Sequence, residues 1–89
     1  MIRHKVIIVN KLGLHARAAA KLVGTASRFD SRILLRKDER EVDAKSILAV
    51  MMLAASKGTT IELIIDGPDE ENAKAALAEL IADYFGEGE

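Results

Sequence analysis

Hydrophobic and polar positions alternate in two segments of the chain, and this period of two is typical of half-buried strands. The segments are Ile2 to Val9 and Thr59 to Asp66. A third strand, Arg32 to Arg36, is predicted by a short run rich in Ile and Leu. After a polar turn, Glu41 to Asp43 is predicted to return as a brief edge strand. The inward positions of the two longer strands are expected to be Ile2, His4, Val6, Ile8, Ile61, Leu63 and Ile65.

Three other segments have the spacing of helices. The first runs from Ala16 to about Arg28. The second is a short apolar helix with Ser46 near its N-cap, and we expect Lys57-Gly58 to end it. The third opens on acidic residues after Gly67-Pro68, where negative charge favours a helix N-terminus. The stripes expected to be buried in the two longer helices are Ala19, Leu22, Val23, Ala26 and Phe29, and Ala73, Ala76, Leu77, Leu80, Ile81 and Tyr84.

The order strand, helix, strand, strand, helix, strand, helix predicts an α+β fold, an open-faced β-sandwich with helices on one face of the sheet. With 89 residues, the chain is expected to form a single domain spanning residues 1–89. Hydrophobic residues make up 49% of it and aromatic residues only 3%, so the core must consist mainly of aliphatic side chains.

Composition narrows the possible chemistry. A net charge of −1 provides no overall attraction to nucleic acid or to an acidic membrane. The absence of cysteine excludes disulfides and thiolate metal sites, and it fits a cytoplasmic protein. We see no signal peptide, no run of membrane-spanning length and no cluster with metal-ligand spacing. We therefore expect no membrane insertion, no metal and no cofactor.

His15 is the strongest candidate for chemistry. If a helix begins at Ala16, then His15 is its N-cap, and the backbone N–H groups of Ala16 and Arg17 are available to an anion. The positive end of the helix also disfavours protonation of the ring, which favours its nucleophilic form. Arg17 adds a forked cation suited to phosphate oxygens, and Gly13 permits a tight turn before the helix. This combination predicts phosphoryl transfer onto His15.

Two simpler interpretations remain open at this point. His15 could be only a polar cap, and Ser46 could be only the cap of the short helix. No second general base, carboxylate pair or glycine-rich nucleotide loop lies nearby, so a carrier is favoured over an independent enzyme. Because a short helix cannot bury all its sides, we expect an exposed docking patch beside His15. The patch comprises Ile47, Leu48 and Met51, with Ala20, Lys21 and Arg17 from the first helix. His4 is assigned to packing.

Residues Gly13 to Arg17 read Gly-Leu-His-Ala-Arg, which resembles the active-site signature of HPr, the histidine phosphocarrier family of the bacterial phosphoenolpyruvate:sugar phosphotransferase system. The resemblance extends over the chain through Lys45-Ser46-Ile47, Lys57-Gly58-Thr59 and the acidic start of the last helix. It implies a four-stranded antiparallel sheet and three helices. It also implies a monomeric carrier, rather than an enzyme, that serves sugar transport.

In that family His15 would accept a phosphoryl group on Nδ1 from enzyme I and pass it to a IIA protein or domain. Arg17 would steady the transferred group. Ser46 would correspond to the regulatory site of the ATP-dependent HPr kinase/phosphorylase.

The sequence departs from the family pattern at a few positions. Ala18 stands where members commonly have proline, and Gly24 and Ser27 stand where some members have lysines. Lys21 and Arg28 are the cations available in place of those lysines, so the docking surface is similar in kind but its individual contacts are not carried over from the resemblance. Two alternatives therefore stay open. One is the nitrogen-branch carrier NPr, which uses the same histidine with a different enzyme I and serves regulation. The other is a non-catalytic interaction module.

Overall fold

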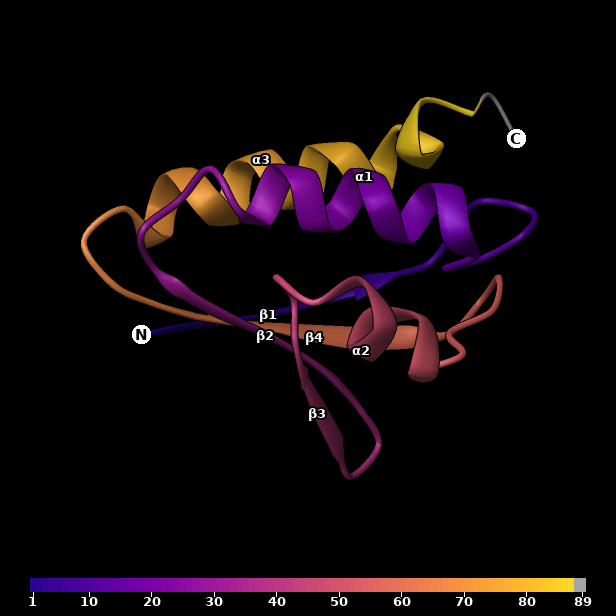
Figure 1. Ribbon diagram of the computed structural model, residues 1–89, viewed down its shortest axis with the longest axis horizontal. Coiled ribbons are helices and arrows are strands. Elements are labelled where there is room, and N and C mark those ends of the chain that lie inside the picture. Colours follow the sequence, from indigo (N-terminus) through magenta and orange to yellow (C-terminus); the bar gives the residue numbers. More distant parts are fainter. Residues whose placement is uncertain (88–89) are drawn as a thin grey trace.

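The computed structural model describes residues 1–87, and its elements follow the predicted order (Figure 1). The sheet has the strand order β1-β4-β2-β3, and each neighbouring pair is antiparallel. The predicted fold class is therefore confirmed. The elements are β1 (Ile2–Ile7), α1 (Ala16–Ala26), β2 (Arg32–Lys37), β3 (Arg40–Asp43), α2 (Ile47–Met52), β4 (Thr60–Asp66), α3 (Glu70–Ala82) and the 3₁₀ helix η1 (Tyr84–Gly86).

The helices cover one face of the sheet. Figure 1 shows α1 and α3 running side by side along it, and α2 packs against α1 and β3. Between helices and sheet lies an aliphatic core, with β4 contributing the residues that were expected to face inward. Its largest fully buried side chains include Ile8, Leu22, Ile33, Leu35, Val50, Leu53, Ile61, Leu63, Ile65, Leu77, Ile81 and Phe85. Among residues 1–87, no helix is both long and apolar enough to cross a membrane.

The other face of the sheet carries alternate, mostly polar side chains. On this face Arg3 of β1 lies across from β4, and its Nη1 is 3.3 Å from Oε1 of Glu62. Because this pair is partly exposed, it stabilises the fold by at most about 1 kcal/mol. The alternation of β1 between half-buried and exposed residues confirms the predicted inward positions, including that of His4.

Two predicted helix ends are wrong, and local hydrogen bonds explain both. Helix α1 ends at Ala26 rather than Arg28. The amides of Arg28 and Phe29 bond to the carbonyl three residues earlier instead of four; Phe29 N, for example, donates to Ala26 O at 3.2 Å. Helix α2 ends at Met52, well before Lys57-Gly58, and Ala54 takes a left-handed conformation at φ 53°. The carbonyls at this end accept hydrogen bonds from the side chains of Lys37 and Arg40.

The end of the buried stripe on α3 also differs from the prediction. Tyr84 was expected to be buried, but it is 39% exposed, whereas Phe85 is completely buried. Helix α3 stops at Ala82, and both Tyr84 and Phe85 have positive φ angles. This turn takes the chain out of helical register, so Phe85 enters the core in place of Tyr84.

A carboxylate joins the start of α3 to the start of β2. Asp69 accepts hydrogen bonds from the backbone N–H of Asp30 and from the N–H and hydroxyl of buried Ser31, at 2.9, 2.9 and 2.5 Å. The Ser31 hydroxyl and the Asp30 amide hold the pKa of Asp69 below its usual value. The stability from this cluster is therefore complete above the unfolded pKa of about 3.9 and is lost as the pH falls through the lower folded pKa.

Asp69→Asn should accordingly destabilise the protein at neutral pH, because the amide cannot accept these bonds as a carboxylate does. The difference from wild type should shrink once the pH falls below about 4. Urea unfolding of both proteins at several pH values measures this. A destabilisation that stays constant from neutral to strongly acidic pH would contradict the prediction.

Candidate functional site

The loop before α1 is held firmly against the end of α2. Gly13 has φ 65°, and the next amide, Leu14 N, donates to Ala55 O at 2.9 Å. Inside the loop, the fully buried Asn10 donates from Nδ2 to Gly13 O at 2.8 Å. The tight turn predicted at Gly13 is therefore confirmed. The bonded loop holds the backbone of His15 in place at the start of α1.

His15 occupies the N-cap position of α1, as predicted. Its backbone is extended, at φ −73° and ψ 177°, and its carbonyl accepts from Ala19 N at 2.8 Å. The imidazole makes no capping hydrogen bond, and the side chain is 27% exposed. Because the ring is not used as a cap, the purely structural interpretation of His15 loses its main support. The first N–H groups of α1, including those of Ala16 and Arg17, have no partner within the helix.

The ring lies in a surface hollow of about 590 Å³ with three cationic side chains on its walls. Arg17 is exposed, and within residues 1–87 it forms no ion pair. Lys21 donates from Nζ to the carbonyl of Phe85 at 2.6 Å. The hollow thus combines a nucleophilic ring, a helix N-terminus and positive charge. The lining residues that matter are Lys11, His15, Ala16, Arg17, Lys21 and Glu87.

Sequence reasoning missed Glu87, which meets the imidazole directly. Its Oε2 lies 2.5 Å from His15 Nε2, and its Oε1 accepts from Asn10 Nδ2 at 3.0 Å. Burial opposes ionisation of this carboxyl, but the hydrogen bonds from His15 and Asn10 bring the pKa of Glu87 below its usual value. Figure 1 shows the start of α1 and the C-terminal segment at the same end of the molecule. His15 and Glu87 are 72 residues apart, so no local pattern pointed to the pair.

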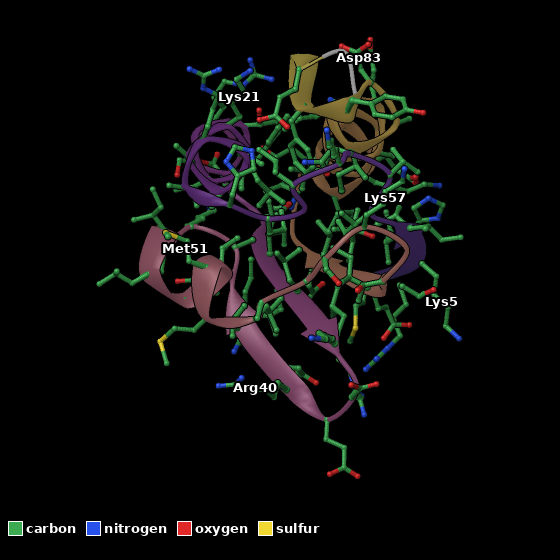
Figure 2. The ribbon with its side chains drawn as sticks, turned by 90° about the vertical axis from the view of Figure 1, so that its right-hand side faces the viewer. Lys5, Lys21, Arg40, Met51, Lys57 and Asp83 are labelled. Atoms are coloured by element: carbon green, nitrogen blue, oxygen red, sulfur yellow. The ribbon has the colours of Figure 1, made fainter. Side chains whose placement is uncertain are left out.

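The predicted apolar patch on α2 is exposed. Ile47, Leu48 and Met51 are 41%, 71% and 39% exposed, whereas Val50 and Leu53 are buried. Figure 2, which views the end of the molecule where α1 begins, places Met51 and Lys21 on the same side. Helices α1 and α2 pack together, and Ala20 and Lys21 of α1 are exposed.

Ser46 caps α2, as predicted. Its Oγ accepts from Ala49 N at 3.4 Å, and its backbone is extended. The residue is only partly exposed. The structure therefore places Ser46 at the first turn of the helix that carries the apolar patch.

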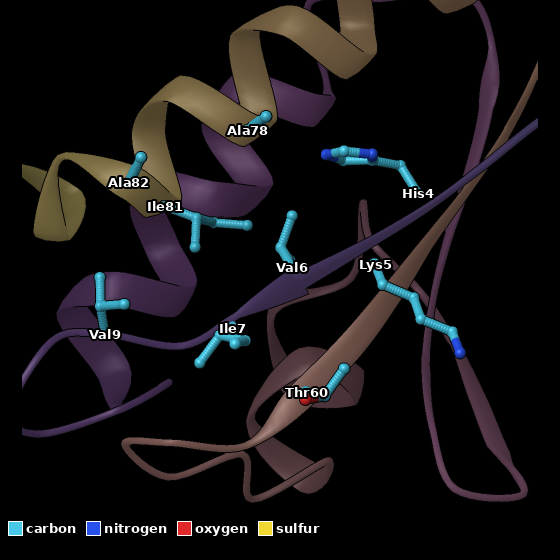
Figure 3. A pocket seen from close by; sticks show the side chains of 9 residues that line it. All are labelled: His4, Lys5, Val6, Ile7, Val9, Thr60, Ala78, Ile81 and Ala82. Atoms are coloured by element: carbon cyan, nitrogen blue, oxygen red, sulfur yellow. The ribbon is translucent and has the colours of Figure 1, made fainter.

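A second hollow, of about 530 Å³, lies between β1 and α3 and does not include His15 (Figure 3). Its walls are mainly apolar, with Val6, Ile7 and Ile81 among them. His4 lies at one end with its ring toward α3, which agrees with the packing role expected for it.

Comparisons with known proteins agree with this geometry. Residues 2–83 match the family described as PTS HPr component phosphorylation site. The chain is 54% identical over 89 residues to the phosphocarrier protein HPr of Neisseria meningitidis, with 100% of both chains covered. It is 56% identical over 87 residues to that of Xylella fastidiosa, with 98% of each covered. The crystal structure of HPr-C-His from Thermoanaerobacter tengcongensis matches with a TM-score of 0.95 and 48% identity, covering 98% of each chain. The chain therefore belongs to the HPr family of phosphotransferase-system proteins, which are phosphocarriers rather than catalysts.

Proposed function

We propose that this chain accepts a phosphoryl group on His15 from enzyme I, which takes it from phosphoenolpyruvate, and passes it to IIA proteins or domains for sugar transport. One observation carries the proposal. The imidazole of His15 stands at the N-terminus of α1, makes no capping bond there and faces a hollow with three cations. An anionic phosphoryl group is attracted by both the helix end and these side chains.

Within this proposal, the backbone N–H groups of Ala16 and Arg17 bind the phosphoryl oxygens. The guanidinium of Arg17 is exposed, so it can turn toward the group and offer two parallel donors. These donors compensate the charge that develops on the oxygens during transfer. Arg17 therefore steadies the group as it arrives from one partner and leaves for the next.

Docking is assigned to Ile47, Leu48 and Met51 together with Ala20 and Lys21. Three exposed apolar side chains beside a cationic rim suit short-lived encounters with several partners. The flexible Met51 side chain can adapt to partners of different shape. Because Lys21 already donates to the Phe85 carbonyl, its charge is held near the rim and is not free to swing outward.

Incubation with enzyme I and phosphoenolpyruvate tests the proposal. We expect one acid-labile, base-stable phosphoryl group per chain, which a IIA protein then removes. The same measurement with a nitrogen-branch enzyme I tests the NPr alternative, since faster labelling by that enzyme would reassign the carrier to regulation. No labelling by either enzyme would leave only the interaction module.

Regulation is proposed at Ser46 through phosphorylation by HPr kinase/phosphorylase. A phosphate adds a charge of about −1.5 to −2 at neutral pH. At the first turn of α2 the helix itself tolerates this charge. The added charge stands at the edge of the docking patch, so its effect falls on partners that approach with acidic or phosphorylated surfaces.

Ser46→Asp should therefore melt near the wild-type temperature, because Asp is also a good N-cap. Repulsion of about 1–2 kcal/mol would slow phosphorylation by enzyme I roughly five- to thirtyfold. The defect should shrink as salt is added, because salt screens exposed charges. Initial transfer rates at low and high salt measure this.

The matched control is Asn72→Asp, which adds the same charge at an exposed position in the first turn of α3, and Figure 1 shows the start of α3 at the opposite end of the molecule from the start of α1. It should transfer at close to the wild-type rate. Equal rates for Ser46→Asp and wild type at low salt would remove Ser46 from the docking surface.

A further inference from the structure

We propose that Glu87 is a positioning residue for His15. Its carboxylate accepts a hydrogen bond from the Nε2–H of the ring and so leaves Nδ1 as the nitrogen with the free electron pair. The inference rests on the proposed function of His15 as phosphoryl acceptor. It starts from the distance of 2.5 Å between Glu87 Oε2 and His15 Nε2.

The chemistry of the two groups determines where the proton lies. A neutral imidazole has one N–H and one acceptor nitrogen, whereas a carboxylate can only accept. A carboxylate in contact with Nε2 therefore selects the form of the ring that carries its proton there. Glu87 ionises readily in this place, because its pKa is held low by the contacts with His15 and Asn10 in spite of its burial.

The carboxylate is held from several sides. Its side chain is 12% exposed, and its other oxygen accepts from Asn10, which is itself completely buried. Two residues earlier, the buried ring of Phe85 anchors the segment in the core, and Lys21 Nζ donates to the Phe85 carbonyl at 2.6 Å. These contacts fix the segment that carries Glu87, and through it the orientation of the imidazole.

The position also suits the charge that transfer creates. The Nδ1 electron pair forms the N–P bond while the bond from phosphorus to the donor's leaving atom breaks, and that electron pair stays with the donor. The ring, which keeps its proton on Nε2, then bears a formal positive charge. The Glu87 carboxylate balances this charge, and it does so from the nitrogen that is not phosphorylated. Glu87 therefore acts on the ring and does not occupy the phosphoryl position.

Nuclear magnetic resonance of protein with ¹⁵N-labelled histidine tests the contact without any partner protein. In the wild type we expect the Nε2–H proton of His15 as a far-downfield resonance that exchanges slowly with water. In Glu87→Ala this resonance should disappear, and in Glu87→Gln, which keeps a neutral acceptor, a less shifted resonance should remain. His4 is the second of the two histidines and serves as the internal control, with unchanged signals. An unchanged His15 resonance in Glu87→Ala overturns the proposal.

Transfer rates from enzyme I test the role. Loss of a charge-assisted hydrogen bond to the reacting ring should slow Glu87→Ala about tenfold, with Glu87→Gln in between. The control Glu79→Ala removes an exposed carboxylate of α3 and should transfer like wild type. Equal or faster transfer in Glu87→Ala overturns the positioning role, and faster transfer would identify the carboxylate as a blocker. A wild type that shows the resonance but accepts no phosphoryl group overturns the proposed function itself, and the two failures are thus distinguished.

Discussion

His15→Ala is expected to abolish phosphorylation by enzyme I and phosphoenolpyruvate while the protein keeps its fold. The side chain is partly exposed and makes no capping hydrogen bond, so its removal deprives α1 of no cap. Loss of the imidazole removes the nucleophile, and the described residues that line the hollow include no second imidazole. Acid-labile phosphate is measured after a fixed incubation, and circular dichroism reports the fold.

The matched control for this change is His4→Ala. It removes the other imidazole from the half-buried side of β1 and should label to the wild-type level. Full labelling of His15→Ala would show that another residue accepts the group. Labelling lost only together with the circular dichroism signal would contradict the expectation that the fold is kept.

Gly13→Ala should cause the largest loss of stability among single-methyl changes near the site. A Cβ at Gly13 would lie 2.4 Å from Ala55 O and 2.8 Å from Ser56 Cα, and backbone atoms cannot turn aside as a side chain can. The φ angle of 65° adds a cost of its own for any residue with a Cβ. A left-handed conformation costs about 1–2 kcal/mol and overpacking about 1–3 kcal/mol, so we expect a loss of roughly 2–5 kcal/mol. Urea unfolding measures it.

Two other glycines provide controls that separate the causes. Gly58 has φ 89° with open space around it, so Gly58→Ala should show the conformational cost alone. Gly24 lies within α1, also in open space, and Gly24→Ala should stabilise the protein by up to about 1 kcal/mol. If Gly13→Ala lowers the free energy of unfolding no more than Gly58→Ala does, then the loop backbone shifts to make room for the added Cβ, contrary to this prediction.

The parts of the fold that could be predicted from the sequence are those controlled by neighbouring residues. Alternation predicted β1 and β4 because the period of two is a local property of each strand. His15 and Ser46 were recognised as helix N-caps because the capping position follows from the residues beside it. The exposure of Ile47, Leu48 and Met51 followed from the limited area that a short helix can bury.

Features that depend on distant residues could not be predicted in this way. The end of α2 is determined partly by side chains from β2 and β3, Lys37 and Arg40, which cover its last carbonyls. The exchange of Tyr84 for Phe85 in the core depends on two backbone angles that the periodicity of α3 does not encode. Glu87 reaches His15 only after the whole chain has folded, and a carboxylate near an acidic chain end resembles any solvated charge.

The strand order has a consequence for how the protein is made. In the sheet β4 lies between β1 and β2, yet it is the last of these strands to leave the ribosome. During synthesis only the β2–β3 hairpin can pair with a neighbour in sequence, and β1 must wait for a partner that arrives after residue 60. Closing so long a loop is slow, and proteins rich in such contacts fold in milliseconds to seconds rather than microseconds. Until then the nascent chain exposes the apolar side of β1, so β1 stays unpaired longer than any other strand of this sheet.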